Sequence, residues 1–106
     1  MSVLMTLTVN GDPQKLEDHT SSNQDTMREV VESAKAHGLI AHRFYGSEDG
    51  QIMVLDEWPD EQSFQAFFEE NGGRIGAMME AAGVTSEPQP KFWRKLETHD
   101  DHGWGA

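Results

Sequence analysis

The chain has 106 residues and a formal net charge of −11, from 19 acidic and 8 basic residues. This charge repels a nucleic-acid backbone and an anionic membrane surface, so neither is an expected partner. The chain contains no cysteine, which excludes disulfides, zinc–thiolate sites and thiol catalysis. No apolar run approaches the roughly 20 residues of a membrane span. The N-terminal segment also lacks the features of a signal peptide, and we therefore expect a cytoplasmic protein.

The first third of the chain predicts a strand followed by helix. Residues 3–9 are apolar and threonine-rich with an alternating pattern, which is typical of a strand. Asp12-Pro13 is a favourable helix start, because the carboxylate can accept backbone N–H groups and proline suits the first helical position. Apolar residues then recur at helical spacing, which predicts a helix over about residues 13–37 with a break near Ser22. Asn23 is expected to cap the second segment.

The middle of the chain predicts a hairpin. Residues 39–45 and residues 51–58 are strand-like, and the loop between them has glycine at both ends. Asp60 is the expected N-cap of the second helical region, whose apolar residues share one face up to Gly83. That face continues across Asn71-Gly72-Gly73, where we expect a kink.

The last part of the chain predicts one more strand, over residues 91–97. We expect a single domain over residues 1–98 and a polar tail over residues 99–106. The order βαββαβ predicts an α+β, ferredoxin-like split sheet with the helices on one face. Several strand segments are nevertheless apolar on both faces, namely residues 3–5, 39–41 and 52–55. A second copy of the chain is the simplest cover for the other face, so we expect a homodimer.

The segment from Val54 to Phe68 carries a family resemblance. An apolar strand ends at Asp56-Glu57-Trp58, a proline turns the chain, and a helix follows with phenylalanines on one face. This arrangement resembles the antibiotic-biosynthesis-monooxygenase-like (ABM) family of dimeric α+β barrel proteins, and the likeness covers roughly residues 3–97. The resemblance implies a pocket between the sheet and the helices, but the family hosts several chemistries.

Haem degradation, one of those chemistries, is disfavoured by the residues. The haem-degrading members resemble this chain around Trp58, and they also carry an asparagine, a second tryptophan and a histidine. Those three fall at Leu4, Phe67 and Ala77 of this chain. Iron needs an axial ligand, and this helix offers no histidine. Nucleotide and flavin motifs are also missing from the sequence, so we expect no cofactor.

Two residues are candidates for catalysis. His42 lies mid-strand and is the best general base, because histidine titrates near neutral pH; its alternative is a buried, hydrogen-bonded histidine. Trp58 could wall the pocket and stack on an aromatic ligand, or simply anchor the turn by packing. The histidines and carboxylates at residues 99–102 have the types of a metal site, but a tail cannot easily hold them rigid, so we expect no metal.

The candidate ligand-binding residues are either polar groups of the first helical region or apolar groups of the second. They are His19, Asn23, Phe64, Phe67, Phe68, Met78 and Met79. The apolar members would suit a small, flat, aromatic ligand, and they would also suit an ordinary core.

The leading functional hypothesis is a cofactor-independent monooxygenase acting on a quinol-like or anthrone-like molecule. Such chemistry needs a dry apolar pocket and a base, and little else from the protein. A non-catalytic ligand-binding or stress-linked homodimer is the alternative. An isomerase or cyclase that uses the same pocket is a third possibility.

Overall fold

The computed structural model describes residues 1–104. The elements in chain order are β1 (Val3–Asn10), α1 (Pro13–Ser22), α2 (Gln24–Ala36), β2 (Ala41–Gly46), β3 (Gln51–Trp58), α3 (Glu61–Ala81) and β4 (Pro90–Trp93). The strands form one antiparallel sheet in the order β2-β3-β1-β4. This is the α+β, ferredoxin-like split sheet that the element order predicted.

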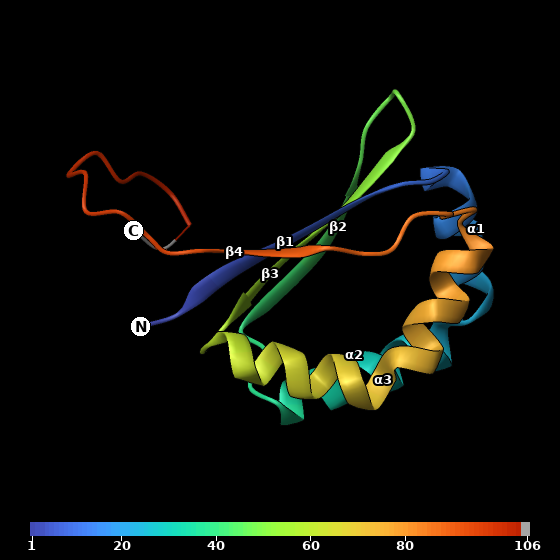
Figure 1. The fold of residues 1–106 in the computed structure, drawn as a ribbon, viewed down its shortest axis with the longest axis horizontal. Helices are drawn as coiled ribbons and strands as arrows, with labels where there is room; N and C mark the ends of the chain where they lie inside the picture. The colour runs from blue at the N-terminus through green and yellow to red at the C-terminus, as the bar shows by residue number, and fades with distance from the viewer. Residues whose placement is uncertain (105–106) are drawn as a thin grey trace.

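All three helices lie on one side of the sheet, as Figure 1 shows. The strand residues that point toward the helices form the core together with apolar residues of α2 and α3. In β1, Met5, Leu7 and Val9 are buried, whereas Leu4 on the opposite face is 43% exposed. The alternation of β1 and β3 therefore divides the sheet into an inner, helix-covered face and an outer, open face.

The first helical region is broken where the sequence predicted a break. α1 ends at Ser22 and α2 begins at Gln24. Asn23 holds the expected N-cap position of α2, but its side chain makes no capping hydrogen bond to that helix. Its amide Nδ2 instead donates to the backbone oxygen of His19, at 2.8 Å. Asn23 is thus the residue between the two helices, and its side chain bonds to the end of α1.

α3 is one continuous helix of 21 residues, with no break at the glycines of its middle. It bends near its middle in Figure 1, in keeping with the expected kink. Asn71 sits inside this helix and is 3% exposed. Within the described residues, no helix is long and apolar enough to cross a bilayer.

Two strand boundaries differ from the prediction by more than one residue. Leu39 donates its N–H to the oxygen of Ala34, at 3.0 Å, and so closes the turn that follows α2, and the strand begins at Ala41. β4 ends at Trp93 rather than at residue 97. Trp93 pairs with Leu4, close to the start of β1. Beyond Trp93, β1 therefore has almost no residues left with which the chain could pair. The tail then leads away from the sheet in Figure 1; residues 105 and 106 lie outside the described part.

The turn from β3 into α3 depends on a cap at Asp60. Its carboxylate accepts from the backbone N–H of Ser63 at 2.8 Å and from the Ser63 hydroxyl at 2.9 Å. These hydrogen bonds, the backbone one first, hold the pKa of Asp60 below its usual value of 3.8. A carboxyl whose pKa is lowered by folding stabilises the folded state above its unfolded pKa, and the stabilisation fades as the pH falls through the folded pKa.

We therefore expect Asp60→Ala to lower the melting temperature at pH 7, because α3 loses its cap. The difference from the native chain should shrink as the pH falls below about 3.8 and the native carboxyl is protonated. Melting curves between pH 2 and pH 7 test this. Asp60→Asn keeps an acceptor without the charge, so a pH dependence equal to that of the native chain in this control would contradict the explanation.

Candidate functional site

A narrow cavity of about 60 Å³ lies between the helices and the inner face of the sheet. Its walls come from α2, α3 and strands β1, β2 and β3, with Leu39 in the turn that follows α2. The lining residues are Met5, Leu7, Met27, Val30, Val31, Ala34, Leu39, His42, Phe44, Val54, Asp56, Phe64, Phe67, Phe68, Ile75, Met78 and Met79. The cavity is therefore a hollow within the hydrophobic core, and its wall is apolar but for one pair of side chains.

His42 and Asp56 are that pair. They are directly opposite each other in the register of β2 and β3, so both point to the inner face. Nδ1 of His42 lies 2.6 Å from Oδ1 of Asp56. A carboxylate only accepts, so Nδ1 is the donor, and in the neutral imidazole the other ring nitrogen, Nε2, is then an acceptor. That is the tautomer a histidine needs in order to act as a base.

Asp56 is the centre of the polar arrangement. It is only 4% exposed, and its second oxygen, Oδ2, accepts from the indole N–H of Trp58 at 3.1 Å. Both carboxylate oxygens thus have a donor. The aspartate holds the histidine from one side and the tryptophan from the other, which fixes the orientation of the imidazole relative to the cavity.

Trp58 lies behind this pair rather than on the cavity wall. It is fully buried, with 0% exposure, and is not among the lining residues. Its ring packs against Phe64 at 5.8 Å and against Phe67 at 5.4 Å between centroids. The structure therefore gives Trp58 a supporting position: it anchors β3 to α3 and donates to Asp56.

The other expected ligand-binding residues fall into two groups. Five apolar ones from α3, namely Phe64, Phe67, Phe68, Met78 and Met79, line the cavity together with His42. His19 and Asn23 do not line it. They are bonded to each other at the α1–α2 junction, where the Asn23 amide donates to the His19 backbone.

A second hollow opens beside the first. It is an open groove of about 430 Å³ between the α1–α2 junction and β2. We call it the outer groove; its lining residues are Thr20, Ser21, Gln24, Met27, Arg28, His42 and Phe44. Met27, His42 and Phe44 line both hollows, so His42 stands where the outer groove meets the inner cavity.

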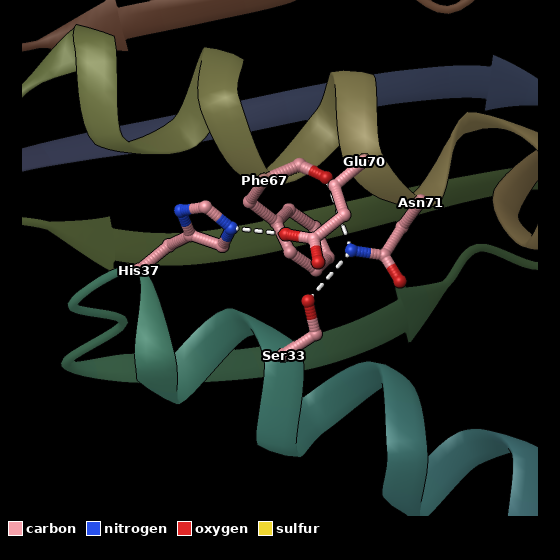
Figure 2. A network of polar contacts seen from close by, with 5 residues as sticks. All are labelled: Ser33, His37, Phe67, Glu70 and Asn71. Atoms are coloured by element: carbon pink, nitrogen blue, oxygen red, sulfur yellow. Dashed lines mark hydrogen bonds and ion pairs between the residues drawn. The ribbon is translucent and has the colours of Figure 1, made fainter.

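A polar clamp holds α2 against α3 at the cavity wall, as Figure 2 shows. Asn71 donates from Nδ2 to the hydroxyl of Ser33 at 2.9 Å and to the backbone oxygen of Phe67 at 3.1 Å. Next to it, Nε2 of His37 pairs with the carboxylate of Glu70. The His37 ring also meets Phe67 edge-on, at 6.5 Å between centroids. The clamp fixes the part of α3 that carries Phe67 into the cavity.

Sequence reasoning missed Asp56, Phe44 and the outer groove. Asp56 did leave a signal, because it alternates with Val54 and Trp58 and so had to share their face. A lone acid between two inward-facing apolar residues requires a buried hydrogen-bond donor. His42 could be identified as that donor only from the register of β2 and β3. The outer groove had no signal of this kind, because it depends on how three elements approach each other.

The histidines and carboxylates at positions 99–102 lie in the tail beyond β4. Within residues 1–104, no three acidic or histidine side chains come together around a common point. Lys95 pairs there with Asp101 at 2.5 Å, and this hydrogen bond is the main cause that raises the pKa of the lysine.

We expect Asp56→Ala to lower the free energy of unfolding by about 2–3 kcal/mol, because the buried indole N–H of Trp58 and Nδ1 of His42 lose their acceptor. Urea unfolding followed by tryptophan fluorescence measures this. Asp18→Ala, on the exposed side of α1, is the matched control and should change little. An Asp56→Ala protein as stable as the native chain would show that the carboxylate does not organise the site.

No family model and no curated protein matches the sequence. Solved structures do match the fold. A monooxygenase from the gene ActVA-Orf6 of Streptomyces coelicolor, in complex with the ligand nanaomycin D, superposes with a TM-score of 0.70 at 15% identity, over 95% of this chain and 93% of that one.

Two other solved structures are similar. A protein whose structure is described as an antibiotic biosynthesis monooxygenase matches with a TM-score of 0.62 at 14% identity, over 90% of this chain and 99% of that one. A dimeric ferredoxin-like protein from an uncultured marine organism matches with a TM-score of 0.65 at 15% identity, over 95% and 93%. The resemblance in the β3–α3 segment is thus confirmed across nearly the whole chain: the protein has the fold of the ABM-like proteins.

Proposed function

We propose that the protein is a cofactor-independent monooxygenase that oxidises a flat aromatic molecule, of the quinol or anthrone class, in the apolar space between sheet and helices. The observation that carries the proposal is the His42–Asp56 pair. It is the one titratable pair on a wall that is otherwise hydrocarbon and thioether. A base in a water-poor setting is what this chemistry requires of a protein.

The reaction needs no external reductant. His42 Nε2 removes a proton from an activated CH₂ of an anthrone, and the resulting anion donates its electrons to dioxygen. A C–O bond forms, which gives a hydroperoxide. The O–O bond then breaks as the same carbon loses its second hydrogen, so that one oxygen atom becomes the carbonyl and the other leaves as water. The substrate loses four electrons and dioxygen gains four.

Asp56 acts on this reaction through His42. It holds the hydrogen on Nδ1 and stabilises the imidazolium formed when Nε2 takes the substrate proton. Trp58 is one step further away, because it touches Asp56 and not the cavity. In this arrangement His42 is the catalytic residue, and Asp56 and Trp58 are positioning residues.

The comparisons support the proposal at the level of the fold. One structure of the same fold is described as a monooxygenase bound to nanaomycin D, and another as an antibiotic biosynthesis monooxygenase. The binding of an aromatic substrate to this chain beside His42, with the apolar residues of α3 lining the space behind that histidine, is part of the proposal. So is a supporting role for His19 and Asn23, which lie beside the outer groove.

The proposal includes a homodimer formed through the outer face of the sheet. The side chains there include Leu4 at 43%, Tyr45 at 44% and Trp93 at 46% exposure. They span the sheet from β2 to β4, and no helix covers them. The similar ferredoxin-like protein is described as dimeric, and a two-fold packing of one face on its own copy is the commonest arrangement.

The alternatives give different outcomes in the same assays. A non-catalytic, ligand-binding or stress-linked dimer would bind aromatic molecules without consuming oxygen. An isomerase or cyclase would convert its substrate in the absence of oxygen.

Oxygen uptake with a panel of quinols and anthrones tests the proposed reaction. We expect at least one substrate to be consumed, and His42→Ala to lower kcat by at least about 100-fold, the usual contribution of a general base. Asp56→Asn should lower kcat while leaving KM nearly unchanged, and Trp58→Phe should have a smaller effect.

His102→Gln, in the exposed tail, removes a histidine far from the cavity and serves as the control. Substrate binding without oxygen uptake would favour the non-catalytic reading, and product formed under nitrogen would favour the isomerase. Uptake that His42→Ala leaves intact would remove His42 from the mechanism.

Analytical ultracentrifugation at micromolar concentration tests the dimer. We expect the native chain to sediment as a dimer and Leu4→Glu to sediment as a monomer, because a charge introduced into the interface is left unpaired. Leu96→Glu is the matched control: Leu96 is 55% exposed but lies beyond the end of β4. A native monomer, or an equal effect of the two variants, would contradict an interface on the sheet.

A further inference from the structure

The geometry points to a division of the site into two compartments: the inner cavity holds dioxygen, and the outer groove holds the aromatic substrate, with His42 between them. This inference rests on the proposed oxygenase function and adds to it a binding site for an apolar gas. Its first basis is the shared wall. His42, Met27 and Phe44 line both hollows, so a molecule in either one lies beside the same imidazole.

The size of the inner cavity selects its occupant. The cavity measures about 60 Å³. An apolar protein cavity of about 150 Å³ accepts one benzene ring, and about 10–15 Å³ is enough for a water-sized probe. A cavity between these limits takes a diatomic molecule or a xenon atom, and it does not take the fused rings of an anthrone without moving its walls.

The chemistry of the wall excludes water in favour of an apolar guest. A buried water needs two to four polar partners. The wall has only two polar side chains, and they are bonded to each other. The second oxygen of Asp56 is occupied by Trp58. What is left is one ring nitrogen of His42 at the edge. Dioxygen forms no hydrogen bonds, so it loses nothing on entering such a space.

The outer groove suits the other reactant. Its volume of about 430 Å³ is in the range of small-molecule sites. Phe44 and Met27 offer flat and adaptable apolar contacts, whereas Ser21 and Gln24 offer hydrogen bonds to ring substituents. A substrate there presents its acidic C–H to His42 from one side. Dioxygen then passes from the cavity beside His42 to the anion, and the C–O bond forms in the outer groove.

Dissolved oxygen is itself a probe, because it is paramagnetic and speeds the relaxation of nearby nuclei without any turnover. The protein is labelled with ¹³C at its six methionine methyl groups. Met5, Met27, Met78 and Met79 line the cavity, Met27 also lines the outer groove, and Met1 and Met53 line neither. We expect the enhancement under oxygen pressure to be larger at Met5, Met78 and Met79, which line the cavity alone, than at fully exposed Met1, and xenon to shift the same three signals.

A matched pair of substitutions separates the cavity from the core in general. Val54 and Val9 are both buried on the inner face of the sheet, but only Val54 lines the cavity. Val54→Ile fills part of the space and should reduce the oxygen effect at Met78 and Met79 by about threefold, whereas Val9→Ile should not reduce it. If Val54→Ile proves unstable, Ile75→Val enlarges the cavity and should raise the effect instead.

Each result bears on one hypothesis. An enhancement largest at Met1, or one that both valine variants reduce equally, overturns the gas compartment whether or not the protein consumes oxygen. A cavity-specific enhancement that Val54→Ile removes supports it. In turnover with any substrate found, Val54→Ile should then raise the KM for oxygen and not the KM for the aromatic substrate. A change only in the KM for the aromatic substrate overturns the assignment of dioxygen to the inner cavity. Absence of oxygen uptake with every substrate counts against the proposed function and not against gas binding.

Discussion

The buried carboxylate of Asp56 is the constraint on which the site depends. A charge that is 4% exposed is costly unless donors surround it. Here the donors come from two neighbours on the inner face: the imidazole of β2 and the indole at the end of β3. Each satisfies one oxygen. These two hydrogen bonds offset the cost of burying the carboxylate. They also fix the tautomer of the histidine and the rotamer of the tryptophan.

Trp58 connects the polar pair to the helices. Its ring contacts Phe64 and Phe67 of α3, and one turn further along α3 Asn71 bonds to Ser33 of α2. A continuous series of contacts therefore runs from the polar pair, through the aromatic cluster, to the second wall of the cavity. The walls of the cavity are held by these hydrogen bonds and aromatic contacts as well as by general packing. This explains how a cavity persists in a small core.

The sequence predicted the elements wherever local chemistry decides them. The alternation in residues 51–58 and the capping aspartates at positions 12 and 60 act within a few residues, so strand β3 and both helix starts are where they were expected. The predictions failed where a partner outside the strand decides. Leu39 donates to the oxygen of Ala34 in the turn that follows α2. The last strand stops at Trp93 because β1 has almost no residues left to pair with. The apolar wall of α3 could be predicted from helical spacing, but Asp56 could not, because its partner depends on the register of two strands.

That register also joins the site to the outer face of the sheet. Side chains in β3 alternate, so Asp56 points inward while Leu55 and Glu57 on either side of it point outward. A slip of one residue between β2 and β3 would move Asp56 to the outer face and leave His42 without its acceptor. A partner molecule packed on Leu55 and its neighbours would oppose such a slip, because the slip would also replace the apolar surface that the partner covers. In the proposed dimer the interface and the catalytic pair are therefore two faces of one strand, and each favours the register that the other requires.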